Sequence, residues 1–125
     1  MLVELNCETD FVARNKDFQK IAYNIAVHVA GMQPLYLAPD DVPEKVVKAE
    51  TDLYKAQAKD KPKAAADKLV EGKLNSFYES VCLLKQPYVL DPDKKVEDLI
   101  SEAVGSWREN ITVSRFVRFE VGERE

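Results

Sequence analysis

The chain has 125 residues, of which 46% are hydrophobic and 32% are charged, so we expect one domain, residues 1–125, with a core and a solvated surface. Its net charge of −4 and its pI of about 5.1 disfavour direct nucleic-acid binding, because affinity for phosphates depends on an excess of lysine and arginine. No apolar run reaches the length of a membrane span and no signal-peptide pattern follows Met1, so we expect no membrane association.

The first predicted element is a β-strand at residues 2–7, where apolar side chains alternate on one face. Thr9 is a predicted helix N-cap, because its hydroxyl can accept a hydrogen bond from a backbone N–H of the first turn. That short helix would project Asp10 and Phe11 from the end of the strand. A carboxylate beside an aromatic ring in such a place indicates a probe that enters a pocket of another protein. The alternative is an ordinary acidic first turn with Phe11 in the core.

A longer helix is predicted from Asn15, as its N-cap, to about residue 30. An apolar stripe at three- and four-residue spacing marks its inner face. Gly31 is expected to end the helix in a left-handed C-cap. His28 lies on the flank of the stripe, where a partly buried side chain with internal hydrogen bonds is the alternative to a contact residue.

Prolines divide the middle of the chain. Residues 32–42 are predicted to be a loop, with one turn at residues 39–41. Pro43 and Pro62 each suit the first position of a helix, which predicts one helix at residues 43–59 and another from residue 62 onward. Residues 55–68 are rich in Ala, Lys and Asp, which predicts a solvated helix pair rather than a linker.

The last third of the chain changes its hydrophobic period. Residues 82–92 are predicted to be a loop, and an apolar face from Val96 to Trp107 predicts a helix. After Asn110 the period becomes two, which predicts a strand over residues 111–121. A lone strand leaves its backbone unpaired, so we expect the two terminal strands to pair. The predicted class is therefore α+β, a small antiparallel sheet of N-terminal and C-terminal strands covered by about four helices.

Cys7 and Cys82 are the only cysteines, and they form no Cys-x-x-Cys pair. They do not make a disulfide framework, so we expect buried free thiols in a reducing compartment. Because the chain also has a single histidine, we expect no transition-metal site and no cofactor.

The run from Glu4 to Arg14 is similar to the second signature of the elongation factor Ts family. That signature reads Glu, an aliphatic residue, Asn, Cys, an acid or amide, Thr-Asp-Phe-Val-Ala, and a basic residue or Asn. All eleven positions match, which is a far stronger signal than a short motif. Other segments resemble the family in the family's order, namely residues 25–30, 70–73, 86–89 and 115–123.

The resemblance implies a guanine-nucleotide exchange factor for elongation factor Tu in protein biosynthesis, and not an enzyme. It implies that Asp10 and Phe11 enter the nucleotide domain of the GDP-bound GTPase near its magnesium. It also implies that His28 touches the GTPase. Thr9 belongs to this partner-binding set, either as a contact or, like Asn6, as a residue that holds the turn. The implied location is the bacterial cytoplasm, or the matrix or stroma of an organelle.

Full-length family members begin with a small helical domain and further strands, and some carry a helical hairpin insert. None of these is recognised in the sequence, so we expect a partial core with an open strand edge that permits a homodimer. One alternative function is therefore a core fragment that acts only in dimerisation. Another is an enzyme that uses Asp10 or Glu8 with His28. It is disfavoured because these residues form neither a triad nor a metal cage.

Overall fold

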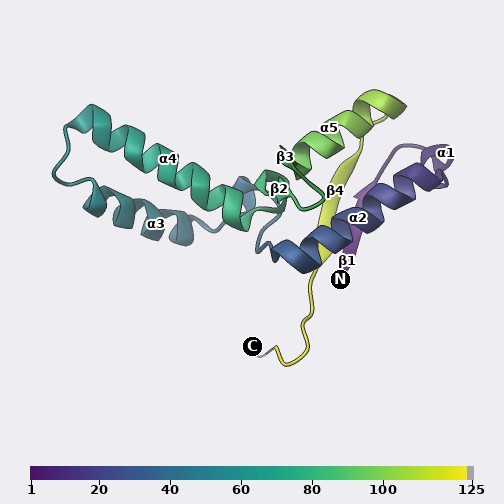
Figure 1. Cartoon of the computed structure of the whole chain (residues 1–125), viewed down its shortest axis with the longest axis horizontal. Coiled ribbons are helices and arrows are strands. Elements are labelled where there is room, and N and C mark those ends of the chain that lie inside the picture. Colours follow the sequence, from purple (N-terminus) through teal and green to yellow (C-terminus); the bar gives the residue numbers. More distant parts are fainter. Residues whose placement is uncertain (124–125) are drawn as a thin grey trace.

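The structure is a computed structural model that describes residues 1–123. The α+β class is confirmed. Its elements are β1 (Leu2–Asn6), α1 (Asp10–Ala13), α2 (Lys16–Met32), the 3₁₀ turn η1 (Pro39–Asp41), α3 (Glu44–Gln57), α4 (Lys63–Val81), the 3₁₀ turn η2 (Leu83–Lys85), β2 (Pro87–Tyr88), β3 (Asp91–Lys95), α5 (Val96–Trp107) and β4 (Thr112–Val117). Figure 1 shows β1, β4, α1, α2 and α5 together, whereas α3 and α4 form a hairpin that projects away from them.

The two terminal strands pair, as predicted. β1 and β4 are antiparallel neighbours in a two-stranded sheet of the described chain. Glu4 lies opposite Arg115 and Leu5 lies opposite Val113, so Ser114 is the extra residue of a β-bulge. A bulge shifts the alternation of side chains by one residue and increases the local twist of the strand.

This shift explains why Arg115 interrupts the apolar pattern of the last strand. Beyond the bulge, Phe116 is the side chain that packs against the core. β4 then ends at Val117, so the predicted strand to residue 121 is too long. Phe119 and Val121 lie beyond this end of the strand and are exposed.

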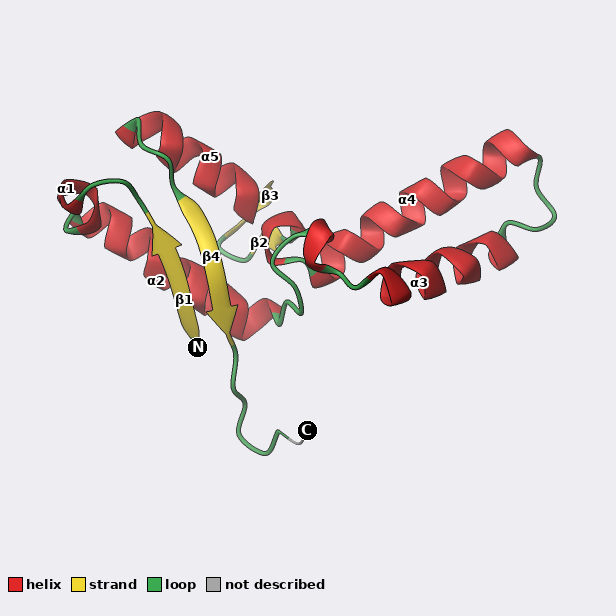
Figure 2. Cartoon of the chain, turned by 180° about the vertical axis from the view of Figure 1, so that it is seen from behind, coloured by secondary structure: helices red, strands yellow, loops and turns green. Residues whose placement is uncertain are grey.

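Figure 2 shows the strand pair in front of α2 and α5, which cover one face of it. Apolar side chains from the sheet and both helices fill the space between them as two clusters. The buried members of the first cluster are Ile25, Val29, Leu83, Tyr88, Val96 and Val113. Those of the second are Val12, Phe18, Ala103 and Ile111.

α2 begins as predicted and ends later than predicted. Asn15 is its N-cap, with Oδ1 accepting the Asp17 N–H at 2.8 Å. The helix continues through Gly31, and the left-handed C-cap is Gln33, with φ of 51°. Pro34 follows it, and a proline disfavours helical backbone at the residue before it. The end of α2 is therefore set by the proline rather than by the glycine.

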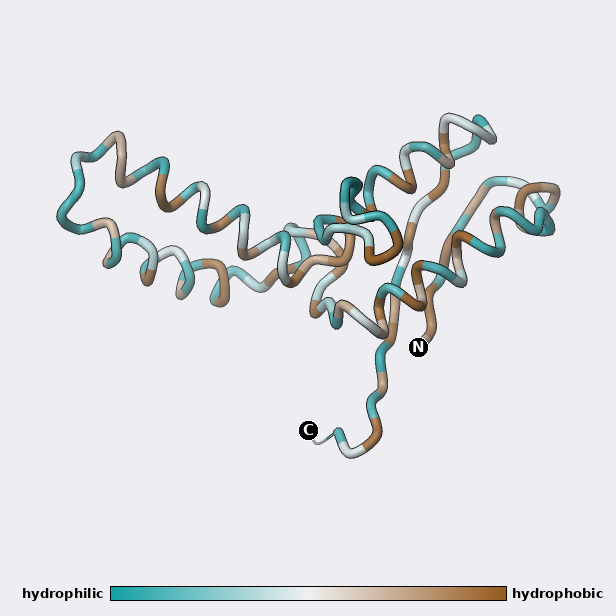
Figure 3. Tube along the Cα trace, in the orientation of Figure 1, coloured by the Kyte–Doolittle hydropathy of each residue, from teal (hydrophilic) through white to brown (hydrophobic). Residues whose placement is uncertain are grey.

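The helix pair α3 and α4 forms as predicted, but it does not cover the sheet. Pro43 and Pro62 lie one residue before the helices, at the N-cap positions. Within these two helices, which are described throughout, no side chain is fully buried. Figure 3 shows mostly hydrophilic residues along both. This projecting hairpin also corrects the expectation that the chain lacks a helical hairpin.

Residues 82–92 are more ordered than the predicted loop. η2 leads into β2, which pairs with β3 through Pro87 opposite Lys95 and Tyr88 opposite Asp91. Pro87 and Pro92 led to the prediction of a loop, because proline within sheets is confined to edge strands and bulges. Among the described residues, no helix is both long and apolar enough to cross a bilayer.

We expect Ile25→Ala to lower the free energy of unfolding by about 2–5 kcal/mol, because it leaves a cavity in the first cluster. Urea denaturation followed by the fluorescence of Trp107 measures the change. The control is Val27→Ala, at a partly exposed position of the same helix, which should stay within about 0.5 kcal/mol. Equal losses at the two positions would contradict the placement of this face of α2 in the core.

Candidate functional site

The turn after β1 carries the predicted pair Asp10 and Phe11. The chain leaves β1 at Asn6 and enters α1, a single turn of helix, at Asp10. Thr9 has extended backbone, and its Oγ1 accepts the Val12 N–H at 3.4 Å. The predicted capping role of Thr9 is thereby confirmed.

Phe11 and Val12 are neighbours in α1 but lie in different surroundings. Phe11 is 84% exposed, whereas Val12 is buried in the second cluster together with Phe18. The alternative that placed Phe11 in the core is therefore wrong, because its neighbour occupies the core position. The result is an aromatic ring held in solvent by a turn that is anchored from the inside.

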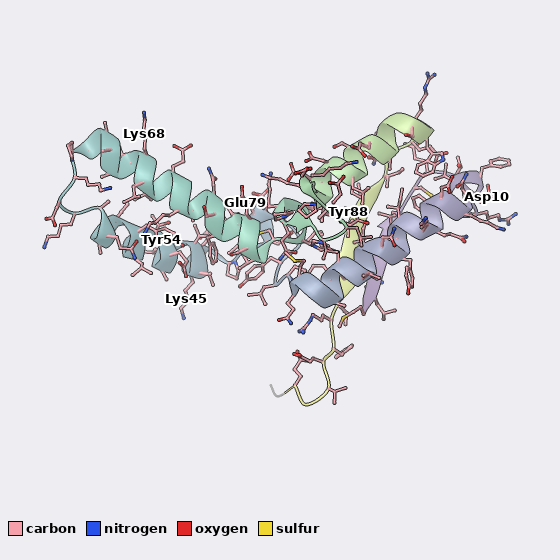
Figure 4. The ribbon with its side chains drawn as sticks, viewed as in Figure 1. Asp10, Lys45, Tyr54, Lys68, Glu79 and Tyr88 are labelled. Atoms are coloured by element: carbon pink, nitrogen blue, oxygen red, sulfur yellow. The ribbon has the colours of Figure 1, made fainter. Side chains whose placement is uncertain are left out.

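Asp10 is also open to solvent and only weakly paired. Its Oδ2 lies 3.8 Å from Nη2 of Arg14, and both side chains are largely exposed. Exposed ion pairs of this kind contribute about 0–1 kcal/mol, so the carboxylate stays available to another group. Figure 4 shows Asp10 at the end of the molecule opposite the α3–α4 hairpin.

A carboxylate from the far end of the sequence holds the start of α1. Oε1 of Glu109 accepts the N–H groups of Glu8 and Thr9, both at 3.0 Å, and Oε2 accepts the Thr9 hydroxyl. In return, Oε1 of Glu8 accepts the Asn110 N–H at 3.2 Å. We call this set of four hydrogen bonds the carboxylate clasp. The hydrogen bonds that Glu109 accepts lower the pKa of its carboxyl, and the one from the Thr9 hydroxyl has the largest effect.

Sequence reasoning missed Glu109 and Asn110. They lie about a hundred residues from the turn that they hold, between α5 and β4. Two consecutive polar residues are typical of any loop that connects a helix to a strand, so Glu109 and Asn110 did not indicate a functional role. The strand pairing was the one available signal, because it brings the start of β4 beside the end of β1.

His28 is fully buried, at the other end of α2 from the Asp10 and Phe11 turn. Its Nε2–H donates to Oε1 of Gln86 at 2.8 Å, and its Nδ1 accepts the Val89 N–H at 3.0 Å. The ring also stacks on Tyr88, with ring centroids 5.9 Å apart. Both nitrogens are thus satisfied within the chain. The structure does not bring His28 together with Asp10 and Phe11, and it leaves the imidazole no exposed surface.

Gln86 extends this internal network. Its Nε2 donates to the carbonyl oxygens of Met32, at 3.2 Å, and Ser80, at 2.9 Å. The network therefore joins the end of α2, the end of α4 and the β2–β3 hairpin. Desolvation lowers the pKa of His28, and the hydrogen bond with Gln86 opposes that effect. The neutral ring is the form that this network needs, because Nδ1 must accept a proton from an amide.

The two cysteines of the described chain are free thiols, as predicted. Cys82 is fully buried, and burial raises its pKa to about 11. Cys7 is half-buried, and its Sγ donates to the carbonyl oxygen of Thr9 at 3.2 Å. The buried, protonated thiol of Cys82 is not suited to act as a nucleophile.

The site projects from the molecule rather than forming a cleft. Across residues 1–123, no three His, Cys, Asp or Glu side chains are placed to hold a metal ion. A hollow of about 550 Å³ opens between residues 33–37 and β4, and none of Thr9, Asp10 and Phe11 lines it. The exposed turn is therefore suited to insertion into another protein rather than to holding a small molecule.

Comparison with known proteins gives one consistent family. A family model described as Elongation factor TS matches residues 19–123. The chain is 54% identical over 123 residues to Elongation factor Ts of Thermotoga neapolitana, a match that covers 98% of this chain and 62% of the relative. It is 48% identical over 126 residues to Elongation factor Ts of Thermodesulfovibrio yellowstonii, covering 100% of this chain and 63% of the relative. The chain thus spans less than two thirds of these relatives.

We expect the free energy of unfolding to fall as the pH is lowered from 7 to about 5.5. The pKa of His28 is lower in the folded than in the unfolded chain, so the unfolded state takes up the proton first. The slope cannot exceed about 1.4 kcal/mol per pH unit, the limit for the uptake of one proton. Urea denaturation at several pH values measures it.

The control for this prediction is His28→Gln, which removes the only imidazole of the chain. This variant should be less stable at pH 7 and should lose most of the slope. A slope that persists in His28→Gln would assign the effect to other groups.

Proposed function

The chain belongs to the elongation factor Ts family, and we propose that it is a guanine-nucleotide exchange factor that binds elongation factor Tu and promotes release of GDP. Its place of action would be that of translation, in the bacterial cytoplasm or within an organelle. The exchange role comes from the family, and the residues proposed to perform it come from the α1 turn.

The observation that carries the proposal is the 84% exposed ring of Phe11 beside the exposed carboxylate of Asp10. Val12 and the carboxylate clasp hold this turn from the inside. Aromatic side chains that enter a pocket and exclude water from it carry much of the binding energy of protein interfaces. A rigid turn also loses little conformational freedom when it binds.

The proposed mechanism is mechanical and electrostatic. GTPases hold GDP largely through its phosphates and through a magnesium ion that neutralises their charge. Phe11 is proposed to wedge into an apolar pocket of the GTPase next to the elements that support the metal, with Asp10 at the rim. Magnesium requires near-ideal octahedral geometry, so a small shift of these elements weakens its binding. Without the metal, repulsion between phosphate and protein carboxylates favours departure of GDP.

Reciprocity constrains this mechanism. If binding of this chain weakens binding of GDP, then GDP must weaken binding of this chain by the same factor. The complex should therefore be tightest with the nucleotide-free GTPase. No proton transfer is asked of Asp10, so the proposal needs no catalytic base.

Thr9 and His28 have supporting roles in this proposal. Thr9 is the N-cap of α1, and its hydroxyl is engaged by Glu109, so it holds the turn rather than facing the partner. The predicted contact of His28 is not part of the proposal, because the side chain is fully buried. Contact through His28 would require the segment at Val89 to open.

Dimerisation alone is the weaker candidate function. In the described chain the β1–β4 pair has no third strand, which leaves edges that a second copy could extend. That function gives no reason for an exposed phenyl ring on a fixed turn at the end of the molecule. Exchange on the GTPase accounts for the ring, so it is the preferred proposal.

We expect this chain to accelerate release of a fluorescent GDP analogue from elongation factor Tu, measured by stopped flow. Phe11→Ala should slow the accelerated release by about thirtyfold, because a central aromatic contact is typically worth about 2 kcal/mol or more. Its stability should change by less than about 0.5 kcal/mol, because the ring is exposed in the free protein.

The matched control is Tyr23→Ala, which removes another exposed aromatic ring, from α2. It should leave the rate within about twofold of that of the unaltered chain. No acceleration by the unaltered chain would contradict the proposed function. Equal losses in the two variants would contradict the assignment to Phe11.

A further inference from the structure

α1 is too short to hold its own geometry. It has four residues, and an isolated helix of that length is unstable in water. The first N–H groups of a helix also have no partner within it. α1, described in full, buries only Val12. The end of α1 is also tied to α2, because Nε2 of Gln19 donates to the Ala13 carbonyl oxygen at 3.2 Å. Neither contact reaches the start of the turn.

Glu109 holds the start of the turn. A single carboxylate accepts the N–H groups of Glu8 and Thr9 and the hydroxyl of Thr9. Hydrogen bonds to an ionised acceptor are about twice as strong as neutral ones. The negative charge also lies at the N-terminus of the helix, where the helix dipole favours it. The lowered pKa of Glu109 agrees with a carboxylate that is held in its ionised form.

The second half of the carboxylate clasp runs in the opposite direction. Glu8 accepts the Asn110 N–H, so each of the two connecting segments supplies one carboxylate to the backbone of the other. These reciprocal hydrogen bonds join the segment that follows β1 to the segment that precedes β4. It fixes the direction in which the chain enters α1 and therefore the direction in which Phe11 points.

We propose that Glu109 is a positioning residue for nucleotide exchange, because its carboxylate fixes Thr9 and thereby the orientation of Asp10 and Phe11 toward the GTPase. Glu109 itself need not touch the partner. This inference rests on the proposed exchange function and adds to it a residue that lies outside the Glu4–Arg14 signature. Without the clasp, the loss of conformational freedom in the turn would offset part of the binding energy of Phe11.

The test compares Glu109→Ala with Glu109→Gln, in the whole chain, by release of the fluorescent GDP analogue from elongation factor Tu. We expect Glu109→Ala to slow accelerated release by about three- to tenfold, the effect of ordering one or two residues on binding. Glu109→Gln should recover part of the rate, because its amide oxygen can still accept from the N–H groups of Glu8 and Thr9.

Two further readouts separate positioning from general stability. In hydrogen exchange, the Glu8 and Thr9 amides should lose protection in Glu109→Ala, while amides in the middle of α2 keep theirs. In a double-mutant cycle, Glu109→Ala should cause little further loss in a Phe11→Ala background, because it acts through that ring. The control is Glu102→Ala, which removes an exposed carboxylate of α5 that is paired with Lys94.

The outcomes distinguish the two proposals. Additive effects of Phe11→Ala and Glu109→Ala, or a normal rate in Glu109→Ala despite lost amide protection, would overturn the positioning role and leave the exchange function intact. Unchanged protection of the Glu8 and Thr9 amides would overturn the clasp itself. If the unaltered chain does not accelerate release, the exchange function fails and the positioning role fails with it.

Discussion

The antiparallel pairing of β1 with β4 is the contact on which the rest of the structure depends. It joins segments about a hundred residues apart and provides the surface on which α2 and α5 pack. It also places the connection from α5 to β4 beside the turn into α1, so that Glu109 reaches Thr9. The turn that carries Asp10 and Phe11 is thus held by tertiary contacts rather than by its own helical propensity.

The two ends of α2 lie in different surroundings and suit different roles. At the first end, an exposed aromatic ring lies on a turn fixed by Val12 and the carboxylate clasp. At the second, the buried His28 and Gln86 join α2 to the root of the projecting α3–α4 hairpin. The first end is exposed and suited to a partner. The second is internal and suited to keeping the hairpin at a fixed angle to the body.

Much of this fold could be predicted from the sequence, because most elements carry strong local signals. The periodic stripe of α2 and the cap at Thr9 are such signals, and both are confirmed. The pairing of the terminal strands followed from another argument, that a lone strand leaves its backbone unpaired, and it is confirmed as well. The rest depended on contacts that local patterns do not encode. The bulge at Ser114 is a matter of register, and the end of α2 at Gln33 reflects the following proline. Glu109 carries no local signal, because Glu8 and Thr9 lie about a hundred residues away from it. Only the expected strand pairing indicated that the two segments lie side by side.

The distance between the two halves of the carboxylate clasp has a consequence for biosynthesis. Glu8 and Thr9 are translated about a hundred residues before Glu109. While the intervening residues are being translated, Phe11 therefore lies on a segment that has neither its strand partner β4 nor the Glu109 carboxylate to order it. Contacts this remote in sequence also form slowly, because a long loop must close first. The segment proposed to face the GTPase is thus translated before the residues that order it.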